Sequence, residues 1–127
     1  MIVGVGVDTI EIARVAALLE RYGARFRRRV FTEGEQRYCD RRRRFAQHYA
    51  ARFAAKEALL KALGIGLRMG VRWRDIEVVN LPDGKPTLRL HGRTAERAAK
   101  LGTHRLELSL THAQEVASAF LILETLG

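Results

Sequence analysis

The chain has 127 residues, 47% of them hydrophobic, which suits a single domain with a real core and excludes a disordered protein. Its one cysteine excludes a disulfide scaffold, and no apolar run approaches the roughly 18 residues that a membrane span needs. With 23 Lys and Arg against 14 Asp and Glu, the formal net charge of +9 indicates an anionic partner; nucleic acid, a phosphorylated metabolite and an acidic protein all remain possible.

The first predicted element is a short strand over Ile2 to Asp8, rich in Val and Ile. No basic segment precedes this stretch and Asp8 interrupts it, so we expect no signal peptide, no membrane partner and a cytoplasmic protein. Because side chains alternate along a strand, Asp8 shares a face with Gly4 and Gly6. Two explanations remain open: the glycines leave room for a ligand beside the carboxylate, or they admit a packed helix while Asp8 caps the next element.

Three helices are predicted after this strand, each with a capping or stop signal. Thr32 and Glu35 form a capping-box pattern, and a glycine follows the first and the third helix. The expected helices are Ile10 to Tyr22, capped by Thr9 and stopped by Gly23, then Thr32 to about Arg41, and Phe45 to Leu63 before Gly64.

Positive charge gathers around the second of these helices. Between Arg21 and Arg44 there are ten Arg and three acidic residues, a local net charge of +7. The chain has 19 Arg and only four Lys, and a compositional bias of the source genome would explain that choice but not the clustering. We therefore expect this segment to dock the anionic partner.

The long helix carries the most informative spacing. Phe53, Glu57 and Lys61 follow one another at intervals of four and so share one helical face. This face sets a carboxyl group against an apolar surface, although a solvated Glu–Lys pair explains the same spacing. The opposite face is small and apolar, and we expect it to pack; its residues are Ala51, Ala55, Ala58 and Ala62.

The second half of the chain is predicted to hold two pairs of strands with a short helix between them. A strong turn signal, Pro82-Asp83-Gly84-Lys85, lies inside the first pair, and the last strand is continuously apolar, as expected for a strand buried on both sides. The elements are strands over Ile76 to Asn80 and Pro86 to Leu90, a helix over Thr94 to Leu101, and strands over Leu106 to Thr111 and Val116 to Leu123. The order β-α-α-α-β-β-α-β-β predicts a single-domain α+β fold with a mainly antiparallel sheet.

The candidates for chemistry favour a hard metal ion. Asp8 and Glu57 have no soft ligands near them, which suits Mg²⁺ held by one or two carboxylates together with substrate phosphates. Lys61, one turn from Glu57, could balance charge on those phosphates, so the pattern fits phosphoryl-type transfer. His112 continues the period-two apolar pattern of the strand before it, and neither the histidines nor Cys39 have the spacing of a zinc site.

Four motifs stand in order along nearly the whole chain. They are Gly4-Val5-Gly6-Val7-Asp8-Thr9-Ile10-Glu11-Ile12, Arg52-Phe53-Ala54-Ala55-Lys56-Glu57-Ala58 with Lys61-Ala62-Leu63-Gly64, Asp75-Ile76-Glu77-Val78 with Gly84-Lys85-Pro86, and Ser109-Leu110-Thr111-His112. In these motifs the chain resembles the holo-[acyl-carrier-protein] synthases, the short phosphopantetheinyl transferases. The resemblance implies a Mg²⁺-dependent transfer of 4'-phosphopantetheine from coenzyme A to a serine of apo-acyl carrier protein, releasing adenosine 3',5'-bisphosphate, in support of fatty acid biosynthesis. It also implies the 4'-phosphopantetheinyl transferase fold and a homotrimer with a site at each protomer boundary.

The resemblance further implies a role for each matching residue. Asp8 and Glu57 would bind the metal, and Glu57, Lys61 and His112 would be catalytic. The residues implied to bind coenzyme A are Arg44, Arg52, Phe53, Lys61, Gly64, Asn80, Lys85, Pro86 and His112. Those implied to dock the acidic carrier protein are Arg14, Arg21, Arg25 and Phe26.

Several points stay open at this stage. The group that deprotonates the acceptor serine could be Glu57, His112 or a metal-bound water. Arg41 to Arg44 suit either the coenzyme A 3'-phosphate or the carrier, and Ile65 stands where the family usually has Thr. A basic RNA-binding module is the main alternative, but only Phe120 offers an aromatic ring on a strand, so we expect no nucleic-acid partner. A trimeric scaffold without catalysis is the second alternative.

Overall fold

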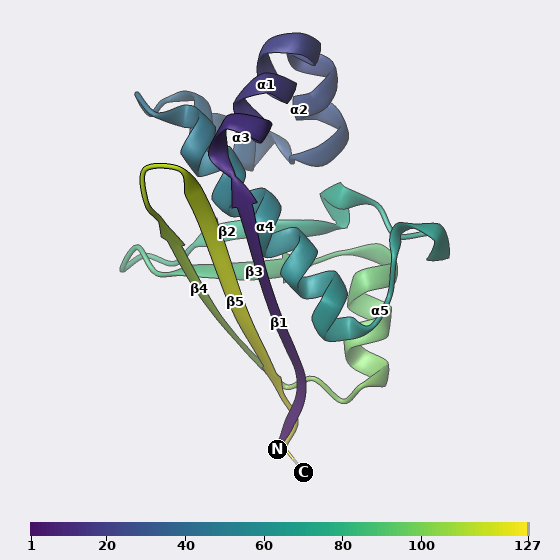
Figure 1. Cartoon of the computed structure of the whole chain (residues 1–127). Helices are drawn as coiled ribbons and strands as arrows, with labels where there is room; N and C mark the ends of the chain where they lie inside the picture. The colour runs from purple at the N-terminus through teal and green to yellow at the C-terminus, as the bar shows by residue number, and fades with distance from the viewer. Residues whose placement is uncertain (127) are drawn as a thin grey trace.

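The structure is a computed structural model that describes residues 1–126. It is an α+β fold with antiparallel sheets, as predicted, and its elements follow the predicted order with one further helix (Figure 1). The strands are β1 (Ile2–Glu11), β2 (Ile76–Asn80), β3 (Pro86–Leu90), β4 (Arg105–His112) and β5 (Val116–Glu124). The helices are α1 (Ile12–Tyr22), α2 (Ala24–Val30), α3 (Glu33–Asp40), α4 (Phe45–Leu63) and α5 (Gly92–Lys100), with 3₁₀ turns at Leu67–Met69 and Trp73–Asp75. No helix among residues 1–126 is long and apolar enough to cross a membrane.

The elements form layers around α4. Three antiparallel strands in the order β1-β5-β4 cover one side of this helix, and the β2–β3 hairpin lies on its other side (Figure 1). Helices α1, α2 and α3 gather at the end of the molecule where β1 finishes, while the N-terminus lies at the opposite end. Helix α4 is therefore the central element, and side chains on its different faces reach different edges of the molecule.

The close approach of β1 and α4 depends on two glycines. A Cβ atom on Gly4 would lie 2.6 Å from the carbonyl oxygen of Ala62, and one on Gly6 would overlap the carbonyl oxygen of Ala58. Of the two explanations that the sequence left open, the packed helix is the one that the structure shows. Asp8 does not cap the next helix, because the N-cap of α1 is Glu11 and no side chain caps it.

Strand β5 is buried on one face within the single chain. Residues facing α4, such as Ala117 and Leu121, are buried, whereas Phe120 on the outer face is 46% exposed. Val5 and Val7 of the neighbouring strand β1 are also exposed on that side. The prediction that this strand is buried on both sides is therefore not met within one chain, because no element within residues 1–126 covers the outer face.

Two details of the first half differ from the sequence prediction. Strand β1 continues to Glu11, and Thr9 hydrogen-bonds Ser118 across the sheet (2.9 Å) instead of capping α1. The short helix α2 was not predicted; it starts directly after Gly23, whose φ of 53° turns the chain between two helices. The capping box of Thr32 and Glu35 is present as predicted.

Candidate active site

Asp8, Glu57 and Lys61 come together where β1 crosses α4. Alternation along β1 turns Asp8 toward the helix, on the same face as the two packing glycines. Lys61 Nζ lies 2.9 Å from Asp8 Oδ1 and donates a further hydrogen bond to the carbonyl oxygen of Val7 (3.1 Å). The side chain of Asp8 is mostly buried, whereas that of Lys61 is 58% exposed, so the cluster opens to solvent on the lysine side.

The surroundings of Glu57 in this cluster disfavour its charged form. Burial raises the pKa of Glu57, and Asp8 raises it further through its charge and a hydrogen bond, while Lys61 and Arg14 act in the opposite direction. Two carboxylates held together repel each other unless a cation or a proton lies between them. The arrangement offers hard oxygen donors to a cation, and the phosphates of a substrate could complete its coordination.

A second group of the predicted residues lies on the hairpin side of α4. Arg52 is almost fully buried and donates from Nη2 to Asn80 Oδ1 (3.0 Å) at the end of β2. Asn80 in turn donates to the carbonyl oxygen of Gly84 and so orders the turn, while Lys85 Nζ lies 3.3 Å from Glu107 on β4. Pro86, which pairs with Asn80 in the ladder, starts β3. Arg52, Asn80, Lys85 and Pro86 therefore form one connected group.

His112 lies near this second group, at the end of β4. Its ring stands edge-on to His48 of α4, with centroids 5.8 Å apart, and His112 lines a surface groove together with Arg44 and Gln47. Burial, with added repulsion from Arg42 and Arg52, lowers the pKa of His48. This edge of the molecule is thus strongly electropositive and suited to an anion.

The structure does not bring all the predicted catalytic residues together in one chain. Asp8 lies on β1 and His112 on β4, and β5 runs between these strands. The first group (Asp8, Glu57 and Lys61) therefore lies toward the β1 edge of the three-stranded sheet, here the first edge. The second group (Arg52, Asn80, Lys85 and Pro86, with His112) lies toward the β4 edge, here the second edge. Phe53 belongs to neither group, because its ring packs in an aromatic cluster with Phe26 (6.2 Å between centroids) and Trp73 (5.0 Å).

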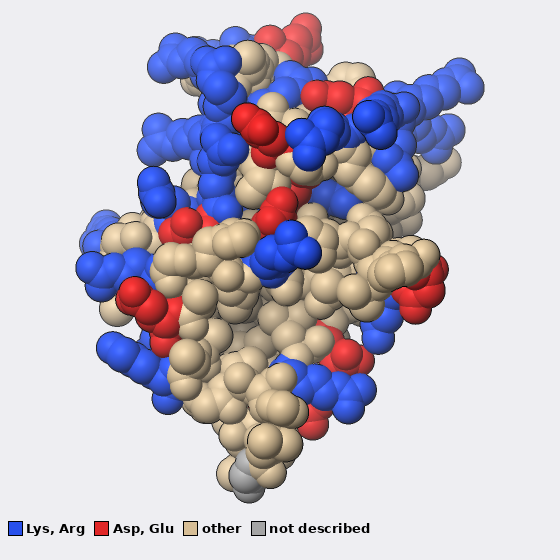
Figure 2. Space-filling model, turned by 180° about the vertical axis from the view of Figure 1, so that it is seen from behind, with Lys and Arg blue, Asp and Glu red and all other residues tan. Residues whose placement is uncertain are grey.

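The residues predicted to dock a carrier protein lie on α1 and α2. Arg14, Arg21 and Arg25 are exposed, and Phe26 is half-buried beside them. Arg25 and Phe26 line a shallow pocket with Leu18 and Tyr22. Figure 2 shows Lys and Arg side chains crowding this end of the molecule, so the charge cluster found in the sequence is a surface feature.

The sequence prediction missed Tyr38, whose aromatic ring makes cation–π contacts with two arginines. The guanidinium carbons of Arg42 and Arg52 lie 3.3 and 3.9 Å from the ring centroid of Tyr38. Arg52 Nε is buried and has no hydrogen-bond partner within residues 1–126, an orphan donor on the same side of α4 as His48. The cation–π contacts join α3 to α4, and the residue spacing alone gave no signal of them.

The glycine-rich segment after α4 is a helix cap. Gly64 adopts a left-handed conformation (φ 68°) and its N–H bonds to the carbonyl oxygens of Leu60 and Lys61. Gly64 is exposed, and neither it nor Gly66 has an atom within 4 Å of the position of an added Cβ. The segment therefore caps the C-terminus of α4, and its exposed backbone next to Lys61 also leaves room for a ligand.

Comparison with known proteins gives one consistent family. Residues 4–120 match the family model of the 4'-phosphopantetheinyl transferase superfamily. A holo-[acyl-carrier-protein] synthase of Methylobacterium radiotolerans is 58% identical over 130 residues, which cover 99% of this chain and 96% of the relative. The crystal structure of the synthase from Neisseria meningitidis superposes with a TM-score of 0.88 at 30% identity, covering 98% of this chain and 100% of that one. The Bacillus anthracis synthase, in complex with CoA (3',5'-ADP), superposes with a TM-score of 0.81 at 37% identity and covers 98% of both chains.

Proposed function

Because this chain belongs to the holo-[acyl-carrier-protein] synthases of the 4'-phosphopantetheinyl transferase superfamily, and is an enzyme of that type, we propose that it uses Mg²⁺ to transfer 4'-phosphopantetheine from coenzyme A to a serine of apo-acyl carrier protein. The observation that carries this proposal is the cluster of Asp8, Glu57 and Lys61 within the matched segment. The proposal includes a role in fatty acid biosynthesis in the cytoplasm, which follows from the carrier protein as the acceptor.

Asp8 and Glu57 would hold the metal ion. The donor set fits Mg²⁺, since both groups are carboxylates and the pair opens to solvent on one side. A cation between them would also relieve the repulsion that, in addition to burial, raises the pKa of Glu57. When bound, Mg²⁺ would neutralise charge on the pyrophosphate of coenzyme A as it reacts.

The residues of the chain would bind and orient the two reactants. In the transfer, the serine oxygen forms a bond to the phosphorus that carries the pantetheine arm, and the bond from that phosphorus to the bridging pyrophosphate oxygen breaks. Lys61, which is exposed beside Asp8, would stabilise the negative charge that grows on the departing adenosine bisphosphate. Arg44, Arg52 and His112, with the hairpin residues Asn80, Lys85 and Pro86, would bind the nucleotide end.

A trimer would unite the two groups of residues. Within one chain they face opposite edges, so a site that uses both needs the first edge of one protomer against the second edge of another. The exposed apolar side chains of Val5, Val7 and Phe120 on the outer face of the sheet supply a surface that such an assembly would cover. Both observations support a homotrimer with a site at each protomer boundary.

The carrier protein would dock on α1 and α2. Arg14, Arg21 and Arg25 are exposed there, and Phe26 adds an apolar contact beside them. Arg14 also acts on the pKa of Glu57, so a carrier bound on this surface would present its serine close to the carboxylate pair. An acidic partner therefore suits both the charge and the position of this surface.

The proposal is tested by weighing an apo-acyl carrier protein after incubation with the enzyme, coenzyme A and Mg²⁺. We expect the carrier to gain the mass of 4'-phosphopantetheine, and we expect chelation of the metal by EDTA to stop this gain. Asp8→Asn and Glu57→Gln should each lower kcat/KM by about a hundredfold, because they remove a ligand for the ion that stabilises the transition state.

The control for these variants is Glu11→Gln, which neutralises a nearby exposed carboxylate at the start of α1. This variant should keep its activity. A carrier of unchanged mass after incubation with the wild-type enzyme would refute the transferase, and full activity of Asp8→Asn would remove Asp8 from the metal site.

A further inference from the structure

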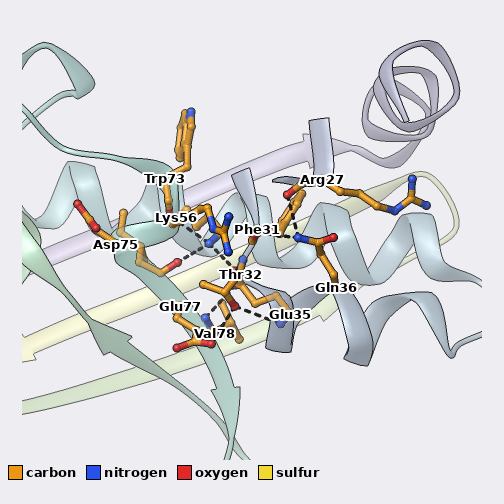
Figure 3. Close-up of polar contacts among 12 residues, drawn as sticks. Arg27, Phe31, Thr32, Glu35, Gln36, Lys56, Trp73, Asp75, Glu77 and Val78 are labelled. Carbon is orange, nitrogen blue, oxygen red and sulfur yellow. Dashed lines mark hydrogen bonds and ion pairs between the residues drawn. The ribbon is translucent and has the colours of Figure 1, made fainter. Parts of the chain in front are cut away.

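A polar network lies in the core beneath the β2–β3 hairpin, and the chemistry proposed above makes no use of it. The side chains of Lys56 and Glu35 are both fully buried, and Lys56 Nζ lies 2.8 Å from Glu35 Oε1 (Figure 3). Lys56 directly precedes Glu57 on α4, yet it points about 100° away around the helix, toward the hairpin. Two ionisable groups this deep in a core need specific partners to offset the loss of water.

Those partners are backbone groups of the segment that leads into the hairpin. Lys56 Nζ donates to the carbonyl oxygens of Trp73 (3.2 Å) and Ile76, so that with Glu35 all three of its protons have acceptors. Glu35 Oε2 accepts from the N–H of Val78 (3.0 Å). The pair therefore binds a backbone carbonyl group and a backbone N–H group within the first three residues of β2.

The same carboxylate also anchors the start of α3. Glu35 Oε1 accepts from the N–H of Thr32 (2.9 Å) in the capping box, and Thr32 Oγ1 donates to Oε2 of Glu77 (2.8 Å) on β2. Three separate elements, α3, α4 and β2, thus meet at one hydrogen-bonded centre (Figure 3).

One helical turn before Lys56, Arg52 holds the far end of the same strand. It donates to Asn80 Oδ1 (3.0 Å), while Lys56 holds Ile76 at the strand's beginning. Strand β2 is consequently fixed to α4 at both ends, which sets its position along the helix and the place of the turn that follows.

The stability of the fold does not by itself explain why an ion pair is buried in this position. Replacing a buried ion pair by apolar residues of similar volume is often neutral or stabilising. Hydrogen bonds, in contrast, constrain distance and direction, and here they constrain the backbone that leads to the hairpin.

We propose that Lys56 and Glu35 are positioning residues for the transfer reaction, which fix the β2–β3 hairpin on α4 so that it is presented correctly to the nucleotide of coenzyme A. The inference rests on the proposed function, because it concerns the hairpin residues assigned there to coenzyme A, namely Asn80, Lys85 and Pro86. It assigns Lys56 no contact with a substrate.

The test is the double variant Glu35→Met/Lys56→Met, which fills the same space without hydrogen bonds. We expect it to fold, as judged by its circular dichroism spectrum, and to raise the KM for coenzyme A about tenfold, with kcat and the KM for the carrier little changed. Isothermal titration calorimetry should show a similar rise in the Kd for coenzyme A. Glu35→Gln, which keeps the size of the side chain and loses one acceptor, should shift the KM in the same direction by less, and it decides the question if the double variant does not fold.

Leu121→Ala is the matched control, because Leu121 is fully buried on β5, which belongs to the other sheet. It should lower Tm while leaving the KM for coenzyme A unchanged. The inference would be overturned by any of three results. These are a wild-type KM for coenzyme A in the folded double variant, a loss confined to kcat, or an equal rise in this KM for Leu121→Ala. Its failure is distinct from failure of the proposed function, because wild-type turnover decides the function, and the Kd of variants relative to wild type decides the positioning role.

Discussion

At Gly6 a single methyl group decides whether β1 can lie against α4. A Cβ there would overlap the carbonyl oxygen of Ala58, and both partners are backbone segments of regular elements that cannot move independently. We therefore expect Gly6→Ala to lower the free energy of unfolding by about 3 kcal/mol, measured by urea denaturation.

Gly66→Ala is the control for that substitution. Gly66 has an extended backbone (φ −132°), and no atom lies within 4 Å of an added Cβ. Its free energy of unfolding should be unchanged or about 0.5 kcal/mol higher, because alanine restricts the unfolded chain. Equal stability of the two variants would show that contact between β1 and α4 is looser than the structure indicates.

At the scale of single residues, the sequence predicted the chemistry of local pairs better than that of distant ones. Alternation placed Asp8 on the face of Gly4 and Gly6, which the structure shows to be the side facing α4, and the spacing of Glu57 and Lys61 placed them on one helical face. The pair of Lys56 and Glu35 was not predicted, since these residues are 21 positions apart and only the packing of α3 on α4 joins them. Lys56 also lies outside the two faces of α4 that the residue spacing singled out, so the sequence gave no reason to expect its side chain to be buried.

At the scale of elements, α1 combines a buried stripe with a charged outer face. Val15 and Leu19 are buried, while Arg14 and Arg21 remain exposed. We expect Arg14→Glu/Arg21→Glu to raise the KM for the carrier about tenfold and to weaken its dependence on salt, with little change in coenzyme A affinity. Steady-state kinetics at two ionic strengths would measure both effects.

Lys100→Glu provides the matched charge reversal, since Lys100 is exposed at the end of α5, outside the segment assigned to docking. It should leave the KM for the carrier close to that of the wild-type enzyme. If the α1 variant behaves in the same way as this control, the arginines of α1 form a solvated face and the docking surface lies elsewhere.

The elements themselves were mostly evident from local signals, and the exceptions have physical reasons. Caps and turns predicted α3, α4 and the hairpin well, because they depend on residues close in sequence. Strand β1 runs past its predicted end because pairing with β5 extends it, a tertiary effect. Helix α2 was missed because four of its seven residues are Arg, which hides the apolar positions that pack.

At the scale of the whole molecule, the division of the site between two edges is the main consequence of the fold. Continuous apolarity of β5 pointed to two buried faces, but within residues 1–126 only one face is buried, and the proposed trimer would cover the other. The sequence motifs suggested residues for the proposed site, but they did not show that Asp8 and His112 lie at different edges of the sheet. That separation follows from the strand order β1-β5-β4, in which the last strand of the chain takes the central place.

A mixture of two strongly impaired variants would test this division directly. Asp8→Asn damages only the first edge, and His112→Ala, at an exposed position, damages only the second. If each site joins the first edge of one protomer to the second edge of another, random trimers co-expressed in equal amounts contain intact pairs at about a quarter of their boundaries. We therefore expect about a quarter of wild-type activity from the mixture, measured as mass gain of the carrier, although each variant alone has far less. Light scattering should show a trimer in every sample, and a mixture as inactive as its components would place the complete site within a single chain.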